Sequence, residues 1–269
     1  MAATDFFYGV DGTGDGDNDV YRADFANSHI RRMYQGWQGR SYYNRGPTNS
    51  GFSTDEKAAQ VVLRATEFWK TAQNLRSPMG TRIFLGGYSR GAAAVVEAAY
   101  LLGKKDIPVH ALLIFDAVDR ATGIQNSDTI PSNVTFCYHA RRDPAAGSRE
   151  FFGNTAYNYE RKWTFYQQKF FHGSHGAIGG TPWKTFNRRD EVQELTDAQM
   201  AAGIIAAGRN TELRRQVILN TYTNVTREQE VAASAASGSW MTLRLEEAKR
   251  VAAAIVVTAR RTAGASGSW

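Results

Sequence analysis

Residues 87–91, with the sequence GYSRG, restrict the fold of this chain more than any other segment. An apolar run at 81–86 precedes them and an alanine-rich stretch at 92–102 follows, so the serine lies between a predicted strand and a predicted helix. At such a turn the flanking glycines tolerate a strained backbone that lifts the serine Oγ off the sheet, and the helix N-terminus lies beneath a developing negative charge. The segment therefore predicts a strand, a sharp turn and a helix, with Ser89 as a nucleophile.

Strand-like apolar segments alternate with helical or polar segments through the first two thirds of the chain. The five segments are residues 5–10, 81–87, 109–115, 133–139 and 168–171. This order predicts a mostly parallel sheet flanked by helices, an α/β fold. One of the helices is expected over 54–76, where apolar residues recur every three or four positions. Residues 12–51 are too many for a simple connection, and we expect them to form a lid or a wall of the substrate site.

The character of the sequence changes after Trp183. Three amphipathic segments that predict helices follow, at 195–207, 212–221 and 243–262. The motif ASGSW occurs at 236–240 and again at 265–269, and we expect both copies to be turns that end in an anchoring tryptophan. The sequence thus predicts a catalytic domain over residues 1–187 and a helical C-terminal extension over 188–269 that packs on it.

Composition and charge argue against a disulfide-bonded protein, a membrane-spanning protein and a nucleic-acid-binding protein. The chain has 269 residues, a formal charge of +6 and one cysteine, Cys137, so it forms no intramolecular disulfide. No apolar run reaches the ~18 residues that span a bilayer. The first residues lack the basic and apolar regions of an export signal, so we expect a cytoplasmic location in the producing cell. The basic residues are scattered, without a basic helix or an aromatic-basic ladder, so we expect no nucleic-acid partner.

A serine nucleophile needs a base, and two of the five histidines lie in one glycine-rich segment, 171–180. This segment follows a short predicted strand, so its loop is expected near the carboxyl edge of the sheet. His175 is the favoured base, because the glycines after it permit close approach of the backbone. His172 is the alternative.

Two aspartates at the carboxyl ends of predicted strands compete for the role of the acid that orients the base. Asp116 follows the apolar strand 109–115, and its neighbours are apolar, so its carboxylate needs a specific partner. Asp143 follows the next strand beside Arg141 and Arg142, which would keep it ionised but could also bind it as a plain ion pair. Asp116 is favoured, and Asp143 is the reserve.

The turn after the first predicted strand offers backbone N–H groups for an oxyanion hole. Gly12 and Thr13 lie in this tight turn, and either amide is expected to act together with the amide of Arg90, the residue after the nucleophile.

Alternating carboxylates follow this turn at Asp15, Asp17 and Asp19, as in a calcium-binding loop. The segment lacks the glycine at the sixth position and the glutamate at the twelfth position of such a loop, where Ala26 stands. We therefore expect a solvated acidic loop rather than a metal site, and the predicted chemistry needs no cofactor.

Five short motifs occur in a fixed order along residues 5–183. They are DGT at 11–13, GYSRGA at 87–92, FDAV at 115–118, HA at 139–140 and FHGSHGAIGG at 171–180. This ordered set resembles the α/β-hydrolase domain of type VI secretion lipase effectors and their uncharacterised relatives. The resemblance implies an α/β-hydrolase fold and a lipase or phospholipase with Ser89, Asp116 and His175 as its catalytic triad. Ala117 stands where this family has threonine, and His172 where proline is usual.

From the residues and the resemblance together we expect a serine-dependent ester hydrolase that acts on a lipid or phospholipid through an acyl-enzyme. The alternatives are an esterase or thioesterase for small soluble substrates and a catalytically silent binding module with the same fold. The resemblance also implies secretion by a type VI system, an immunity protein or secretion-system partner, and peripheral contact with a membrane.

Overall fold

The computed structural model describes seven stretches of the chain. They are residues 4–48, 53–74, 80–118, 123–149, 152–181, 190–219 and 221–251. Within these ranges no helix combines the length and the apolarity needed to cross a membrane.

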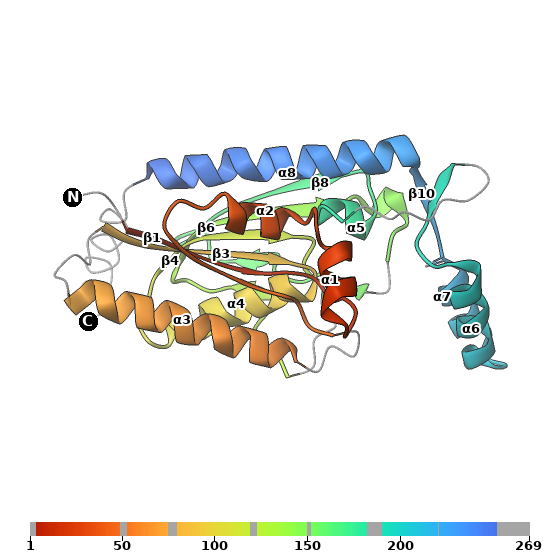
Figure 1. The fold of residues 1–269 in the computed structure, drawn as a ribbon, viewed down its shortest axis with the longest axis horizontal. Coiled ribbons are helices and arrows are strands. Elements are labelled where there is room, and N and C mark those ends of the chain that lie inside the picture. The colour runs from red at the N-terminus through yellow and green to blue at the C-terminus, as the bar shows by residue number, and fades with distance from the viewer. Residues whose placement is uncertain are drawn as a thin grey trace.

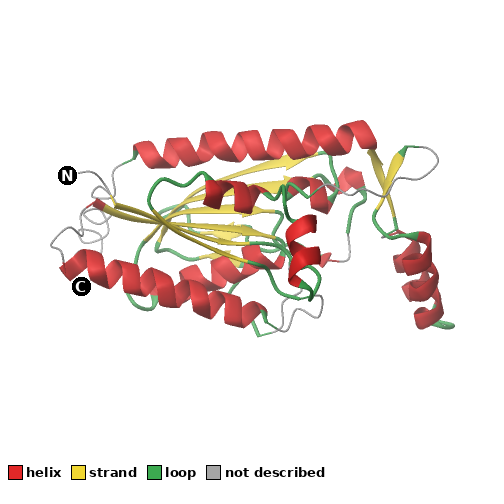
Figure 2. Ribbon diagram, viewed as in Figure 1, coloured by secondary structure: helices red, strands yellow, loops and turns green. Residues whose placement is uncertain are grey.

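A six-stranded, fully parallel sheet forms the centre of the molecule (Figure 2). In spatial order its strands are β2 (Arg40–Asn44), β1 (Thr4–Val10), β3 (Thr81–Tyr88), β4 (Val109–Phe115), β6 (Val134–Arg142) and β8 (Phe165–Phe171). The central strands β3 and β4 are buried along their whole length, which explains their predominantly apolar sequences. The predicted α/β class and all five predicted strands are confirmed.

Helices cover both faces of the sheet (Figure 1). On one face lie α3 (Thr54–Asn74) and α4 (Arg90–Gly103), and on the other lie α2 (His29–Gln35) and α8 (Arg227–Arg250). The short helices α1 (Asn18–Asp24) and α5 (His175–Ile178) lie near the carboxyl edge of the sheet. Alanine and glycine predominate in the first half of α4, so this helix approaches the sheet closely enough to be buried almost throughout.

Residues 12–48, the described part of the predicted lid or wall over 12–51, are not one long loop, and their role at the substrate site stays a prediction. This stretch contains α1, α2 and β2, and β2 extends the sheet by pairing with β1. Aromatic packing explains the added strand: the ring of Tyr42 lies 5.8 Å from the rings of both Phe6 and Tyr8. Residues 49–52 lie outside the described part.

The segment after residue 190 is partly β, which the sequence did not predict. Strands β9 (Glu191–Gln193) and β10 (Tyr222–Thr226) pair antiparallel and carry between them α6 (Asp197–Ala207) and α7 (Thr211–Leu219), close to the predicted helices. This pair of helices stands away from the sheet and contains no buried residue (Figure 1). The predicted boundary at residue 187 falls in 182–189, outside the described residues.

Helix α8 begins earlier than predicted and contains the first ASGSW copy, so the expected turn at 236–240 is wrong. The helix continues because the motif faces the sheet: the Trp240 ring lies 6.1 Å from that of Phe171 and 6.4 Å from that of Tyr138. Ser237 is fully buried beneath the same face. The second copy, at 265–269, lies outside the described residues.

The remaining described elements are short. They are β5 (Thr129–Ile130), which pairs in parallel with β7 (Asn158–Tyr159), and the 3₁₀ helix η2 (Pro144–Ala146).

Candidate active site

Ser89 lies at a strained turn between β3 and α4. Its backbone has φ 58° and ψ −127°, a conformation that L-residues rarely adopt. The glycines on either side leave no room for a side chain: a Cβ on Gly87 would come within 2.5 Å of the Cα of Ala92, and one on Gly91 within 2.2 Å of the Asp11 carbonyl oxygen. The turn therefore has the geometry of a nucleophile elbow, and the fold is α/β-hydrolase-like.

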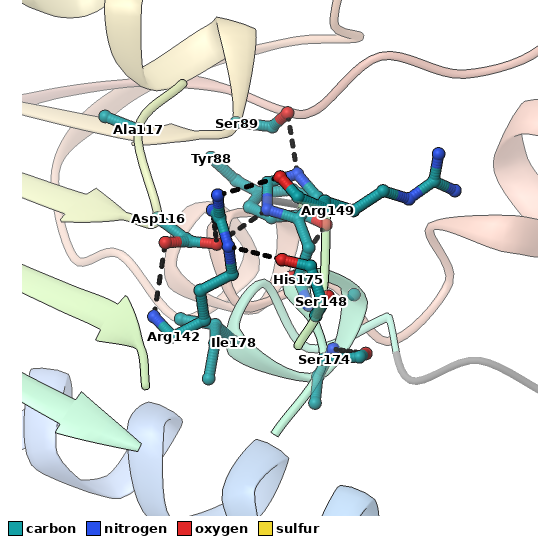
Figure 3. Close-up of polar contacts among 12 residues, drawn as sticks. Tyr88, Ser89, Asp116, Ala117, Arg142, Ser148, Arg149, Ser174, His175 and Ile178 are labelled. Carbon is teal, nitrogen blue, oxygen red and sulfur yellow. Dashed lines mark hydrogen bonds and ion pairs between the residues drawn. The ribbon is translucent and has the colours of Figure 1, made fainter. Parts of the chain in front are cut away.

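The structure brings Ser89, His175 and Asp116 together (Figure 3). The Ser89 Oγ lies 2.9 Å from Nε2 of His175, and Nδ1 of the same ring lies 2.7 Å from Oδ2 of Asp116. The three residues follow β3, β8 and β4, whose carboxyl ends meet at one edge of the parallel sheet. We call these three hydrogen-bonded residues the relay. All three side chains are buried, so the relay is shielded from bulk water.

A buried arginine that the sequence did not single out completes this group. Arg142, at the end of β6, places Nη1 2.6 Å from Oδ2 of Asp116 and donates its backbone N–H to Oδ1 of the same carboxylate. It also donates to the carbonyl oxygen of Ser148 over 2.9 Å. No local signal in the sequence points to this contact, since it depends on the pairing of β4 with β6, which brings the ends of the two strands side by side.

These contacts set the charges of the relay. Burial alone would raise the pKa of Asp116, but the Arg142 guanidinium and the hydrogen bond from His175 outweigh it and hold that pKa well below its usual range. The pKa of His175 is lowered from 6.5, chiefly because burial disfavours the imidazolium, although Asp116 acts in the opposite direction. At neutral pH Asp116 is therefore ionised, and His175 is neutral and able to accept a proton.

We expect the acidic limb of the kcat/KM profile for ester hydrolysis to have its midpoint below pH 6.5, because the pKa of His175 lies below that value. Activity is expected to fall only when the pH drops far enough to protonate Nε2, so His175 should still be able to accept a proton in mildly acidic solution. Initial rates with a soluble ester over the acidic range test this. A midpoint above 6.5 would contradict the desolvated environment assigned to His175.

The reserve residues lie apart from Ser89. The Asp143 carboxylate caps η2 by accepting the Ala145 N–H over 2.9 Å. Its nearest histidine nitrogen is Nδ1 of His172, at 3.8 Å. The other nitrogen of His172 lies 3.2 Å from the carbonyl oxygen of Asn224. Neither the reserve acid nor the alternative base is therefore part of the buried relay.

One of the predicted oxyanion donors has another partner. The Gly12 N–H donates to Oδ1 of Asp11 over 3.1 Å, because this fully buried carboxylate needs donors. Tyr43 donates to Oδ2 of Asp11 over 2.9 Å, and burial raises the pKa of Asp11 to about 6. Thr13 lies beside the elbow, where its hydroxyl accepts from the Arg90 side chain over 3.2 Å.

The acidic loop is built as a helix cap. Asp17 accepts the N–H groups of Asp19 and Val20 at the start of α1, and these backbone bonds lower its pKa. Asp15 accepts the N–H of Asp17 over 2.8 Å, and Asp19 pairs with Arg22 at 3.4 Å. Among the described residues no group of three or more His, Cys, Asp or Glu side chains is placed to hold a metal ion.

No protein-family model matches this sequence, and no curated protein matches it. Among solved structures, the chain is similar to an uncharacterized protein from Pseudomonas aeruginosa, with 14% identity and a TM-score of 0.45 over 92% of this chain and 52% of that one. The chain thus spans about half the length of that protein.

Two further solved structures are similar over a smaller part of this chain. A cutinase-like protein from Cryptococcus sp. has 15% identity and a TM-score of 0.30 over 62% of this chain and 78% of that one. The RedJ thioesterase from the prodiginine biosynthetic pathway of Streptomyces coelicolor has 14% identity and a TM-score of 0.35, over 67% and 82%. At TM-scores this low, the likenesses do not bear on the activity of the chain.

Proposed function

We propose that this protein is a serine ester hydrolase that works through an acyl-enzyme. The observation that carries the proposal is the relay of Ser89, His175 and Asp116, joined by contacts of 2.9 and 2.7 Å at a strained elbow. Nothing in this relay requires a cofactor.

The geometry supports a two-stage reaction. Nε2 of His175 takes the proton of the Ser89 hydroxyl as Oγ attacks the ester carbonyl carbon, and the resulting imidazolium then gives that proton to the departing alcohol. A water molecule attacks the acyl-enzyme in the second stage, with its proton passing to Nε2 and on to the Oγ of Ser89 as the carboxylic acid leaves. Asp116 keeps the Nδ1 proton of His175 in place and stabilises the imidazolium.

The oxyanion of the tetrahedral intermediate needs N–H donors beside the elbow. We assign the amide of Arg90, at the N-terminus of α4, together with the amide of Thr13. Gly12 is the weaker choice of the two turn residues, because its N–H already donates to Asp11.

For the substrate we propose a lipid ester, and within that class a phospholipid. Support comes from the ordered motifs that resemble type VI secretion lipase effectors and from the formal charge of +6, which favours anionic lipid surfaces. The same resemblance supports a proposed role as a secreted effector that has a cognate immunity protein.

Labelling with a fluorophosphonate, followed by peptide mapping, tests the mechanism, because only an activated hydroxyl reacts. We expect a single label on Ser89. Incubation with mixed phospholipids, a short-chain soluble ester and a thioester, with products identified by mass spectrometry, then tests the substrate class.

The outcomes separate the candidate functions. Release of fatty acid from phospholipid supports the lipase. Turnover of only the soluble ester or thioester assigns the alternative esterase. Absence of label and of turnover assigns a silent binding module and contradicts the proposed mechanism.

A further inference from the structure

The backbone around the proposed base His175 is held from two sides by serine hydroxyls. The His175 N–H donates to Oγ of Ser148 over 2.7 Å (Figure 3). On the other side, Ser174 caps α5, with its Oγ accepting the Ala177 N–H. The position of the imidazole therefore depends on where these two hydroxyls lie.

Each of these hydroxyls is bound by a buried carboxylate from the segment after residue 190. The Ser148 hydroxyl donates to Oε1 of Glu194, the residue that follows β9. The Ser174 hydroxyl donates to Oε1 of Glu230, in the first turn of α8, and the Ser174 N–H donates to Oε2 over 2.8 Å. Glu194 is 3% exposed and Glu230 is fully buried. Both are expensive to bury unless they serve a specific contact.

The ionised form of Glu194 sets the direction of the Ser148 bond. Burial raises the pKa of Glu194 to about 7, while Arg149 and the Ser148 hydroxyl act in the opposite direction. Above that pH the carboxylate only accepts, so the single proton of the Ser148 hydroxyl points to Glu194 and an oxygen lone pair is left for the His175 N–H. Glu194 is itself fixed on two sides. Its Oε2 lies 3.0 Å from Nε of Arg149, and its backbone N–H donates to the carbonyl oxygen of Thr221 over 2.7 Å.

The Ser148 turn is also held from the sheet side. Arg142, which binds the Asp116 carboxylate, donates to the carbonyl oxygens of Ser148 and Arg149 over 2.9 and 3.1 Å. The turn thus lies between an arginine from β6 and a glutamate from the C-terminal segment. Arg142 contacts Asp116 directly, whereas Glu194 reaches His175 only through Ser148.

We propose that Glu194, acting through Ser148, is a positioning residue for His175, so that the segment after residue 190 forms part of the catalytic machinery. The inference rests on the proposed ester hydrolysis for its kinetic consequence. Glu194 touches no reacting atom. It fixes the hydroxyl that fixes the backbone of the base, and a displacement of the base by about 1 Å costs on the order of 100-fold in rate.

The first test removes the hydroxyl that joins the two residues. We expect Ser148→Ala to lower kcat by about 10- to 100-fold with little change in KM, because the substrate still binds while the imidazole is poorly placed. The matched control is Ser127→Ala, which removes another buried serine hydroxyl, one that contacts Thr155 and takes no part in the relay. The control should retain wild-type kcat.

The second test asks whether Glu194 acts through Ser148. Glu194→Ala should lower kcat to a similar extent. The kcat of the double variant, with both Ser148→Ala and Glu194→Ala, should lie within about twofold of the kcat of the less active single variant, because both changes break the same chain of contacts. Glu194→Gln keeps an amide oxygen that can accept the Ser148 hydroxyl, so it should lose less than Glu194→Ala. Multiplicative losses in the double variant, or a wild-type kcat for Ser148→Ala, would overturn the proposal.

A third measurement separates this inference from the proposed function. Hydrogen exchange at the His175 amide, followed by NMR, does not depend on turnover, and we expect it to accelerate in both alanine variants and to stay unchanged in Ser127→Ala. Unchanged exchange in both alanine variants contradicts the positioning role, whatever the protein hydrolyses. Faster exchange in a protein without label or turnover contradicts the proposed hydrolysis while leaving the Glu194 contact established.

Discussion

We expect the Ser89→Ala variant to lose about 10⁴-fold or more in kcat for ester hydrolysis and to keep its fold. The loss follows from removal of the nucleophile, whose Oγ lies 2.9 Å from the proposed base. Stability should change little, because alanine accepts the same strained backbone about as well as serine and the lost hydroxyl leaves only one hydrogen bond of the imidazole unmade.

Steady-state kinetics on the ester turned over by the wild type, with circular dichroism and thermal unfolding of both proteins, provide the measurement. Ser127→Ala is the control for loss of a buried serine hydroxyl away from the relay. A Ser89→Ala protein with wild-type turnover would rule out the acyl-enzyme.

The second large effect concerns Arg142, whose guanidinium lies 2.6 Å from the fully buried Asp116 carboxylate. We expect Arg142→Met to lower the free energy of unfolding by about 3–5 kcal/mol at neutral pH, because removal of one partner leaves a buried charge poorly compensated. Activity should fall as well, since Arg142 also holds the carbonyl oxygen of Ser148.

The pH dependence gives this prediction a sign. In the wild type the pKa of Asp116 is lowered from 3.8, so its contribution to stability is fully present above 3.8 and is lost as the pH falls through the lower pKa of the folded state. The stability difference between wild type and Arg142→Met should therefore be largest at neutral pH and shrink in strong acid.

Chemical denaturation at several pH values measures this difference. Arg141→Met is the matched control, because Arg141 is the neighbouring arginine on β6 and its guanidinium binds the exposed Gln168 side chain instead. We expect a change within about 0.5 kcal/mol for this control. Equal losses in the two variants would show that the Asp116 contact contributes nothing specific.

Some features of the fold and site follow from local sequence. The glycines around Ser89 predicted the elbow. The structure shows why glycine is needed there, since no larger residue fits beside Ala92 or the Asp11 carbonyl. Asp116 was indicated by the apolar strand before it, and His175 by its glycine-rich loop. The structure places His175 in contact with both Ser89 and Asp116. Their catalytic roles stay predictions until they are tested.

Other features escaped prediction because their signal is not local. Strand β2 has a polar, aromatic sequence of an edge strand and is recognisable only through its pairing with β1. The first ASGSW copy has the composition of a turn, yet packing of Trp240 on the sheet keeps it helical. In both places tertiary contacts outweighed the local preference.

By itself, the sequence determined the α/β class and the position of the elbow, because strand periodicity and glycine placement can be recognised from neighbouring residues. It favoured Asp116 and His175 as the partners of Ser89 but left Asp143 and His172 as alternatives. Only the tertiary structure decided what supports that relay. Arg142 meets Asp116 across 26 positions, and Ser148 meets Glu194 across 46. The chain has many other charged and hydroxyl side chains that could have formed such pairs. Which of them do so depends on which side chains the packed edge of the sheet buries away from water.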